Sequence, residues 1–433
     1  GATWREIAAT GVRGAEYAQL RRGDPLTFAG LGSLPGQALL AEYHVTEDAV
    51  VLLLITSDAP QPLVVRVPLS RAALDRVVTD SFTDVRSADP GDWRALSPLV
   101  APLVEHSAPG QVIWIVPHDH LHGVPLHAVE VDGVPLAERN PTCYTPSAAV
   151  MRYCQAKRRP GVGRSVVLAD SRPDRPLPHS RAHSAVIASL LDGAERFVGE
   201  QASVSGLKTA MREGVSVLHI ACHGEFDAER PARSRVLLAG TRVVSDGALT
   251  AERILGMSLP ADLVTLSACQ SGVAHRRAGD ELFGLPRALI YAGASAVLVS
   301  LWPVDEVATS LLMDSFYRAR GAGADKAEAL RTAQLAVRGA TCADVIDYCG
   351  AVGGDERTVM RGVADLRFRA GDFAAAADAY EALLDSSDDA SLLTAHARAT
   401  LASRGTTAPP DYTRKVYAHP YHWAGFVLIG DWR

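Results

Sequence analysis

Runs of hydrophobic residues separated by polar turn residues mark the first part of the chain. Residues 38–70 contain three such runs, which predict three short strands, and the apolar run VIWIV after position 111 predicts a fourth. A helical spacing of hydrophobic residues lies between the third and fourth runs. We therefore expect a first α/β unit over residues 36–155, preceded by a helical or linker segment over residues 1–35.

From about residue 160 the pattern changes to strands that alternate with amphipathic helices. The strands are predicted by the apolar runs SVVLAD, SVLHIACH, ADLVTLSAC and SAVLVSLW. The segments between them, and the long segment that begins at Val304, have the hydrophobic spacing of helices. Such alternation is typical of a doubly wound, mostly parallel sheet with flanking helices. We assign this second α/β unit to residues 160–340 together with residues 411–433, where strand character returns.

Residues 355–405 are rich in alanine and have the spacing of helices. The part from Gly371 to Leu384 resembles the second half of one tetratricopeptide repeat (TPR), with small residues where paired helices pack closely. One repeat cannot bury its own hydrophobic face, so we interpret this segment as a helical insert or docking surface. The predicted fold class is thus α/β with a helical, TPR-like insert.

The charge and the cysteine content indicate which binding partners and which cellular compartment to expect for this protein. A net charge of −6 disfavours a protein whose main partner is a nucleic-acid backbone. The six cysteines are scattered without a CxxC spacing, which indicates reduced thiols in the cytoplasm. No apolar run approaches the roughly 18 residues that a membrane span needs, so we expect no membrane partner. The chain begins with Gly1 in place of Met, and we expect an upstream sensor or regulatory region in the intact protein.

Two motifs bring nucleophilic chemistry to the second unit, VLHIACHG at 217–224 and LVTLSACQSG at 263–272. Each places a reactive side chain, His223 or Cys269, after a predicted strand, and functional groups gather at the carboxyl ends of parallel strands. A thiol attacks a carbonyl as its thiolate and therefore needs a neighbouring base such as an imidazole. The backbone N–H groups of Gly224 and Cys269 are candidates for holding the oxyanion that such an attack creates.

Neighbouring histidines and cysteines have structural interpretations. Strand alternation puts His219 on the same side as His223 but deeper in the sheet, and it puts Cys222 on the opposite face. We therefore expect His219 and Cys222 in the core.

The segment 118–127, HDHLHGVPLH, is rich in metal-ligating residues. Zinc sites usually draw their ligands from spaced segments, and no cysteine or acidic cluster stands nearby. We therefore interpret Asp119 and these histidines as a solvated loop, and we expect no metal and no other cofactor.

Several blocks of the sequence resemble the CHAT domain of the caspase, separase and gingipain group of cysteine proteases. They are VLHIACHGEF, LVTLSACQSG, GDELFGLPRALIYAGASAVLVSLWPVDEVAT and HPYHWAGFVLIGD, and upstream ALLAEYHV, IWIVPHDHLHGVPLHAV and CYTPSAAV. The resemblance implies a caspase-like fold in which His223 is the dyad histidine and Cys269 the nucleophile. It also implies that the 36–155 unit is a pseudo-protease half packed against the catalytic half.

The resemblance further implies a cysteine endopeptidase that cleaves a protein substrate. In bacteria, CHAT proteases commonly act in regulated defence or cell-death pathways, where the substrate is a partner such as a gasdermin-like protein. The alanine- and arginine-rich composition fits a high-GC bacterium. Two alternatives stay open. One is a catalytically silent CHAT scaffold that binds partners through its helical insert and groove, and the other is an enzyme that acts on a small acyl group or amide.

The residues after the run SAVLVSLW are candidates for substrate binding. The spacing of Asp305 after the nucleophile resembles the position of the acid with which separases select arginine. This resemblance implies that the substrate has a basic residue before the scissile bond. The same aspartate is well suited to cap the helix that follows. Trp302 and Leu301 are suited equally to the lining of a substrate groove and to the core.

Overall fold

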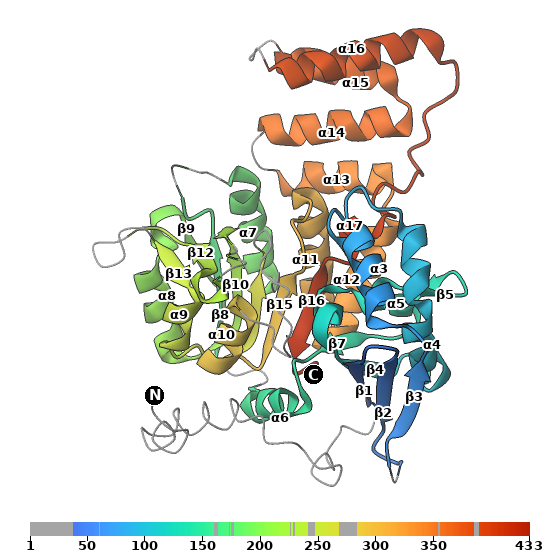
Figure 1. Cartoon of the computed structure of the whole chain (residues 1–433). Helices are drawn as coiled ribbons and strands as arrows, with labels where there is room; N and C mark the ends of the chain where they lie inside the picture. The colour runs from blue at the N-terminus through green and yellow to red at the C-terminus, as the bar shows by residue number, and fades with distance from the viewer. Residues whose placement is uncertain are drawn as a thin grey trace.

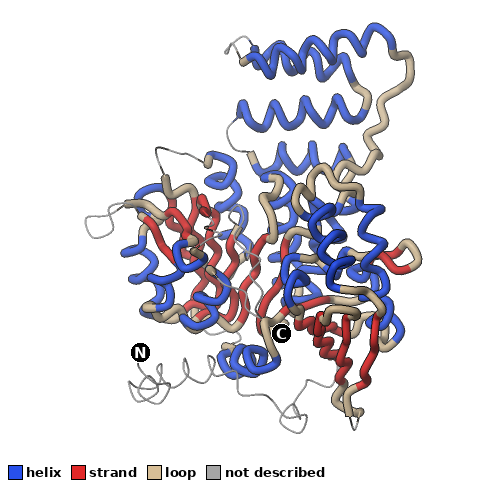
Figure 2. Tube along the Cα trace, viewed as in Figure 1, coloured by secondary structure: helices blue, strands red, loops and turns tan. Residues whose placement is uncertain are grey.

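The fold is built around one large sheet, shown in the computed structural model of Figure 1. The structure describes residues 38–59, 61–159, 163–172, 174, 177–225, 227, 230–240, 247–267, 284–353, 356–384 and 389–433. The strands of this sheet follow the order β3 (Leu63–Val67), β2 (Val50–Ile55), β1 (Ala38–Val45), β4 (Val112–Val116), β7 (Thr142–Tyr144), β16 (Phe426–Gly430), β15 (Ala296–Ser300), β14 (Ala261–Leu266), β10 (Val215–Ala221), β8 (Arg164–Ala169) and β9 (Glu195–Val198). Helices cover it (Figure 2), so the predicted α/β class with a mostly parallel sheet and flanking helices is confirmed.

The C-terminal strand β16 joins two halves of the sheet that run in opposite directions. β16 pairs in parallel with β7 and antiparallel with β15, where Ser300 lies opposite Phe426. β1, β4 and β7 run parallel to β16, whereas β14, β10, β8 and β9 run parallel to β15. Segments 36–155 and 160–340 thus contribute strands to the same sheet. Their division into a pseudo-protease unit and a catalytic unit stays a prediction.

Glycine is required where β16 ends against β15. Gly430 has a φ of 111°, which few other residues adopt. A Cβ at this position would also lie only 2.4 Å from the backbone oxygen of Ser295. The close approach of the two strands at the junction of the sheet halves therefore depends on this residue.

Alternate residues of the strands face two separate hydrophobic layers. One layer packs against α3 (Arg71–Phe82), α4 (Ser97–Glu105), α8 (Val204–Ala210), α9 (Ala251–Leu255) and α10 (Leu285–Ala292). The other packs against α7 (Pro178–Leu190), α11 (Glu306–Gly321), α12 (Lys326–Gly339) and α13 (Cys342–Val352). Because both faces are covered, central strands are continuous apolar runs, as in β4, where all five residues are buried.

Many of these helices begin at residues whose side chains accept hydrogen bonds from the first turn. These caps are Ser70, Ser147, Ser203, Thr250, Asp305, Asp325 and Thr341. Short polar side chains suit this role because they satisfy N–H groups that have no partner within the helix.

Shorter elements connect the strands and helices of the sheet. They are β5 (Glu130–Val131), β6 (Val134–Pro135), β11 (His223–Glu225), β12 (Arg235–Leu237), β13 (Ala248–Thr250), α5 (Leu136–Arg139), α6 (Ala148–Lys157), α17 (Pro420–Trp423), η2 (Pro90–Leu96), η3 (Asp119–Gly123), η4 (Leu126–Ala128), η5 (Gly199–Gln201), η6 (Met211–Glu213) and η7 (Pro231–Arg233).

Three helices extend the molecule beyond α13, as Figure 1 shows. They are α14 (Glu356–Ala370), α15 (Phe373–Leu384) and α16 (Ala390–Gly405). They share a small core of their own, which includes Ala364, Ala376, Tyr380 and Leu392. The helical character predicted for residues 355–405 is thus confirmed. The predicted segment at 1–35 lies outside the described residues, and within them no helix has the length and apolar character needed to cross a bilayer.

Candidate functional site

The predicted dyad histidine lies just beyond the end of a central strand. β10 ends at Ala221, and after Cys222 the chain enters β11, in which His223 and Gly224 pair antiparallel with Leu237 and Val236 of β12. His223 is half-buried, whereas the residues just before it on β10 are buried. The chain therefore carries this imidazole out of the sheet and towards the surface, at the edge where β14 and β10 both end.

The second motif ends at the same edge of the sheet. β14 lies parallel to β10, with Leu266 opposite Ile220, and the backbone N–H of Ser267 donates to the backbone oxygen of Ile220 over 2.9 Å. Cys269 lies outside the described residues, which resume at Gly284 before α10. The structure thus places His223 and Gly224 but not the predicted nucleophile.

His219 is held in a buried polar chain beneath this edge. Its Nδ1 lies 3.1 Å from the hydroxyl of Tyr317, which donates to Thr265 Oγ1 over 2.8 Å. Burial lowers the pKa of His219 to about 3, so the ring is neutral. The prediction that His219 is a hydrogen-bonded core histidine is confirmed.

The described cysteines are poor nucleophiles. Cys222 faces the hydrophobic layer opposite His219, and burial raises the pKa of its thiol to about 12. Its assignment to the core is therefore confirmed. The remaining described cysteines are also buried, and burial raises each of their pKa values: they are Cys143, Cys154, Cys342 and Cys349. A thiol must ionise to attack, so none of the described cysteines is suited to catalysis.

Asp305 caps the helix that follows β15. Its Oδ1 accepts a hydrogen bond from the backbone N–H of Ala308 over 2.8 Å, and the carboxylate is half-buried. The charge of Asp305 acts on two neighbouring side chains, Tyr417 and His422, whose ring centroids are 4.8 Å apart. Burial is the main cause that raises the pKa of Tyr417, and the charge of Asp305 adds to it. The helix-capping interpretation is thus confirmed, and it leaves the choice of substrate residue undecided.

The structure places Trp302 in the core. Only 6% of its surface is exposed, and its indole N–H donates to the backbone oxygen of Tyr421 over 3.0 Å. Leu301 is half-buried, and its backbone N–H donates to Gly425 over 2.8 Å. A Cβ at Gly425 would lie 3.0 Å from the indole nitrogen, so glycine lets the last strand approach the ring closely. Of the two residues, Leu301 is the more accessible to a ligand.

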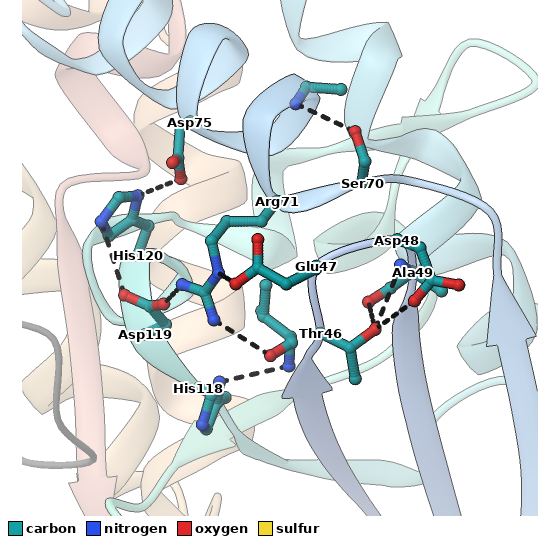
Figure 3. A network of polar contacts seen from close by, with 12 residues as sticks. Thr46, Glu47, Asp48, Ala49, Ser70, Arg71, Asp75, His118, Asp119 and His120 are labelled. Atoms are coloured by element: carbon teal, nitrogen blue, oxygen red, sulfur yellow. Dashed lines mark hydrogen bonds and ion pairs between the residues drawn. The ribbon is translucent and has the colours of Figure 1, made fainter.

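The expectation of a solvated loop at 118–127 was wrong for most of its polar residues. The side chain of Asp119 is only 7% exposed, and it pairs with both Arg71 and His120 (Figure 3). The Nδ1 atom of His120 lies 2.6 Å from the carboxylate of Asp75. His118 Nδ1 accepts from the backbone N–H of Val45 over 3.2 Å. A left-handed backbone at Asp119, with φ 55°, turns the loop back onto α3.

His127 in the same segment is also part of the core. Its two ring nitrogens lie 3.0 Å from the hydroxyl of Tyr144 and 3.1 Å from the amide nitrogen of Gln334. These partners could not be recognised from the local sequence, because Arg71 is 48 positions from Asp119 and Gln334 is 207 positions from His127. The part of the chain that the structure describes contains no group of three or more ligands arranged for a metal ion.

Comparisons with known proteins identify one family and several distant relatives. The sequence profile of the CHAT domain matches residues 93–431. Human tetratricopeptide repeat protein 28 is 24% identical over 245 residues, which cover 49% of this chain and 10% of that protein. The mouse protein of the same name is 28% identical over 174 residues, which cover 33% of this chain and 7% of that protein. The chain therefore spans a tenth or less of the curated relatives it matches.

Solved structures of proteases share part of the architecture. The Saccharomyces cerevisiae separase in complex with securin aligns with a TM-score of 0.47 and 9% identity, over 74% of this chain and 30% of that one. The Arg-specific cysteine proteinase gingipain R aligns with a TM-score of 0.38 and 11% identity, over 56% of this chain and 62% of that one.

Proposed function

Because this chain belongs to the CHAT domain family, we propose that it is a cysteine endopeptidase with a His223–Cys269 dyad. His223 takes the proton of the Cys269 thiol, and the thiolate forms a bond to the scissile carbonyl carbon. The N–H groups of Gly224 and Cys269 stabilise the oxyanion. The C–N bond then breaks as His223 gives its proton to the leaving amine. Water, deprotonated by His223, cleaves the thioester and restores the thiol.

The observation that carries the proposal is the hydrogen bond between Ser267 and Ile220 at the ends of β14 and β10. Cys269 follows Ser267 by two residues, and an extended chain spans at most about 3.6 Å per residue. His223 follows Ile220 by only three residues. The short sequence distance of both residues from these paired strand ends supports the assignment of the dyad.

The other cysteines support the same assignment by their chemistry. All five that the structure describes are buried, and each has a raised pKa. Cys269 is the remaining cysteine of the sequence, and it follows a strand end beside a half-buried histidine. A catalytic thiol at this position fits the needs of acyl transfer better than any of the others.

The proposal extends to the substrate. β15 pairs with β14, so the loop that carries Leu301 and Asp305 begins beside the loop that carries Cys269. The carboxylate of Asp305 is suited to a guanidinium or ammonium group, which favours a basic residue before the scissile bond. From the family resemblance, we propose that the substrate is a protein of a bacterial defence pathway, such as a gasdermin-like protein.

A fluorogenic peptide library tests the proposal. Cleavage by the wild type that disappears in Cys269→Ala and persists in Cys222→Ala supports it, because the control removes a nearby thiol that has no proposed role in the reaction. Equal cleavage by the wild type and Cys269→Ala contradicts it.

The second candidate is a catalytically silent scaffold. Relatives named for tetratricopeptide repeats and the stack of α14, α15 and α16 favour a binding role. An acyloxymethyl ketone peptide separates the two candidates, because it alkylates an active thiolate irreversibly. Labelling at Cys269 supports the protease. Absence of labelling, together with absence of peptide cleavage, favours the scaffold.

A further inference from the structure

The last helix of the α14–α16 stack, α16, exposes two large hydrophobic side chains at the outer end of the molecule (Figure 1). Leu393 is 54% exposed and Leu401 is 73% exposed. Leu392 and Ala399 of the same helix are buried in the core that the three helices share. One face of α16 therefore packs on the stack, and the opposite face presents hydrophobic residues to solvent.

The exposed hydrophobic residues form an apolar stripe made of Leu393, Ala397 and Leu401. All three are exposed, and they follow one another at intervals of four residues. Residues four apart in a helix lie on one face, one above the other. The small side chain of Ala397 lets a second helix approach closely, while the leucines on either side contact that helix. The apolar stripe is thus suited to packing against another helix.

The sequence of α16 indicates which helix fits the apolar stripe. Residues 393–401 read LTAHARATL, which is the same in both directions except at positions 396 and 398. When two copies of α16 pack antiparallel about a two-fold axis at Ala397, Leu393 lies opposite Leu401 of the partner subunit. Two-fold symmetry repeats the same contact on the other side of the axis. The apolar stripe is therefore complementary to itself.

The two residues that break the symmetry interact within their own chain. The guanidinium of Arg398 lies 5.5 Å from the centre of the Phe368 ring in α14. His396 Nε2 lies 3.3 Å from Thr400 Oγ1 one turn further along α16. Positions 396 and 398 are also each about 100° around the helix from Ala397, so they flank the apolar stripe and do not interrupt it.

We infer that α16 is the interface of a two-fold dimer, in which it packs antiparallel against α16 of a second copy of this chain. Arg404 in its last turn then meets the first turn of the partner helix, which has an aspartate, Asp389, as its N-cap. Opposite charges thus come together at both ends of the contact. The inference does not depend on the proposed dyad.

The size of the contact determines how strong the dimer can be. α16 has 16 residues and is about 24 Å long. One pair of such helices forms a small contact beside the standard protein–protein interface of about 1,600 Å². We therefore expect a reversible dimer whose population rises with protein concentration.

Sedimentation equilibrium of the full chain in the Cys269→Ala background tests the inference without interference from catalysis. The mass should rise from monomer to dimer across micromolar concentrations. Leu401→Glu should keep the chain monomeric, because dimerisation would bury a carboxylate in an apolar contact. Leu255→Glu is the matched control, because Leu255 is 44% exposed at the end of α9, and it should leave dimerisation unchanged. A parent chain that stays monomeric would leave the apolar stripe to a helix of another protein and overturn the inference. A dimer that survives Leu401→Glu would also overturn it.

Cysteine cross-linking in the same background tests the two-fold axis and does not rely on disrupting the contact. In Ala397→Cys the two new thiols meet at the axis, so mild oxidation should link the dimer covalently. In Thr394→Cys the antiparallel arrangement keeps the two thiols about 9 Å apart along the helices, which is too far for a disulfide. The five cysteines that the structure describes are buried, which limits competing disulfides. Failure of Ala397→Cys to cross-link, or equal cross-linking of Thr394→Cys, contradicts the antiparallel dimer.

Discussion

Lys326 Nζ lies 2.9 Å from Asp262 Oδ2, and both side chains are buried at the junction of the two sheet halves. The lysine also donates to the backbone oxygen of Arg433 over 2.6 Å. Asp262 lies in β14, Lys326 begins α12, and Arg433 follows β16. One ion pair therefore connects the strand that leads to Cys269 with the strand that joins the halves.

We predict that Lys326→Met lowers the free energy of unfolding by about 3–5 kcal/mol, because it leaves the buried carboxylate of Asp262 without its cation. Urea denaturation measures this change. Adding Asp262→Leu to Lys326→Met should recover much of the loss, since no charge then stays buried. Arg66→Gln, which removes an exposed ion pair, should leave the unfolding midpoint unchanged. A Lys326→Met protein as stable as the wild type would contradict the prediction.

Stability should fall as the pH falls below about 6.5. Burial lowers the pKa values of His127, His183 and His219 to about 3 in the folded protein, against 6.5 for a free side chain. Between these values the unfolded chain binds more protons, so acid favours unfolding. Each histidine contributes a slope of about 1.4 kcal/mol per pH unit within this window.

Urea denaturation at pH 7 and pH 5.5 measures this slope while most carboxylates stay ionised. His219→Gln should reduce the slope by the share of one histidine, whatever its effect on stability itself. His106→Gln is the control, because His106 is exposed. A slope that is the same in His219→Gln and the wild type would rule out His219 as a source of the acid sensitivity.

The hydrophobic pattern predicted most elements of the fold but not how the two α/β units combine. The three hydrophobic runs in 38–70 form β1, β2 and β3. The segments of the second unit that were predicted as alternating strands and helices form strands covered by helices. Periodicity reports local structure, and it contains no information on which distant strands pair. The position of β16 between β7 and β15 is a long-range pairing that depends on Gly430.

The candidate site was predictable only in part, for a related reason. Strand alternation was enough to place His219 and Cys222 on opposite faces, because that argument needs no distant partner. The loop at 118–127 was predicted as solvated because its residues are polar. Its burial depends on Arg71, which compensates the charge of Asp119 from a different helix. Polar residues that are buried by distant partners cannot be recognised from local composition.

We predict that the native protein contains one thiol that reacts rapidly with Ellman's reagent. The five cysteines that the structure describes are buried, and a buried thiol with a raised pKa reacts slowly. Cys269→Ala should remove the rapid phase, and Cys222→Ala should retain it. In denaturant all six cysteines of the wild type should react. A rapid phase that persists in Cys269→Ala would assign the accessible thiol to another cysteine.

Asp305→Asn separates the two roles assigned to this residue. Asparagine caps helices about as well as aspartate, so the hydrogen bond to Ala308 and the stability of the protein should survive. The substitution removes the charge, so cleavage after arginine or lysine should fall by tenfold or more relative to cleavage after neutral residues. Asp305→Ala should lose the same preference and in addition about 1 kcal/mol of stability. Peptide profiles and urea denaturation of the two variants measure both effects. If Asp305→Asn keeps the wild-type cleavage profile, the carboxylate serves the helix alone, and a basic preference must come from elsewhere in the site.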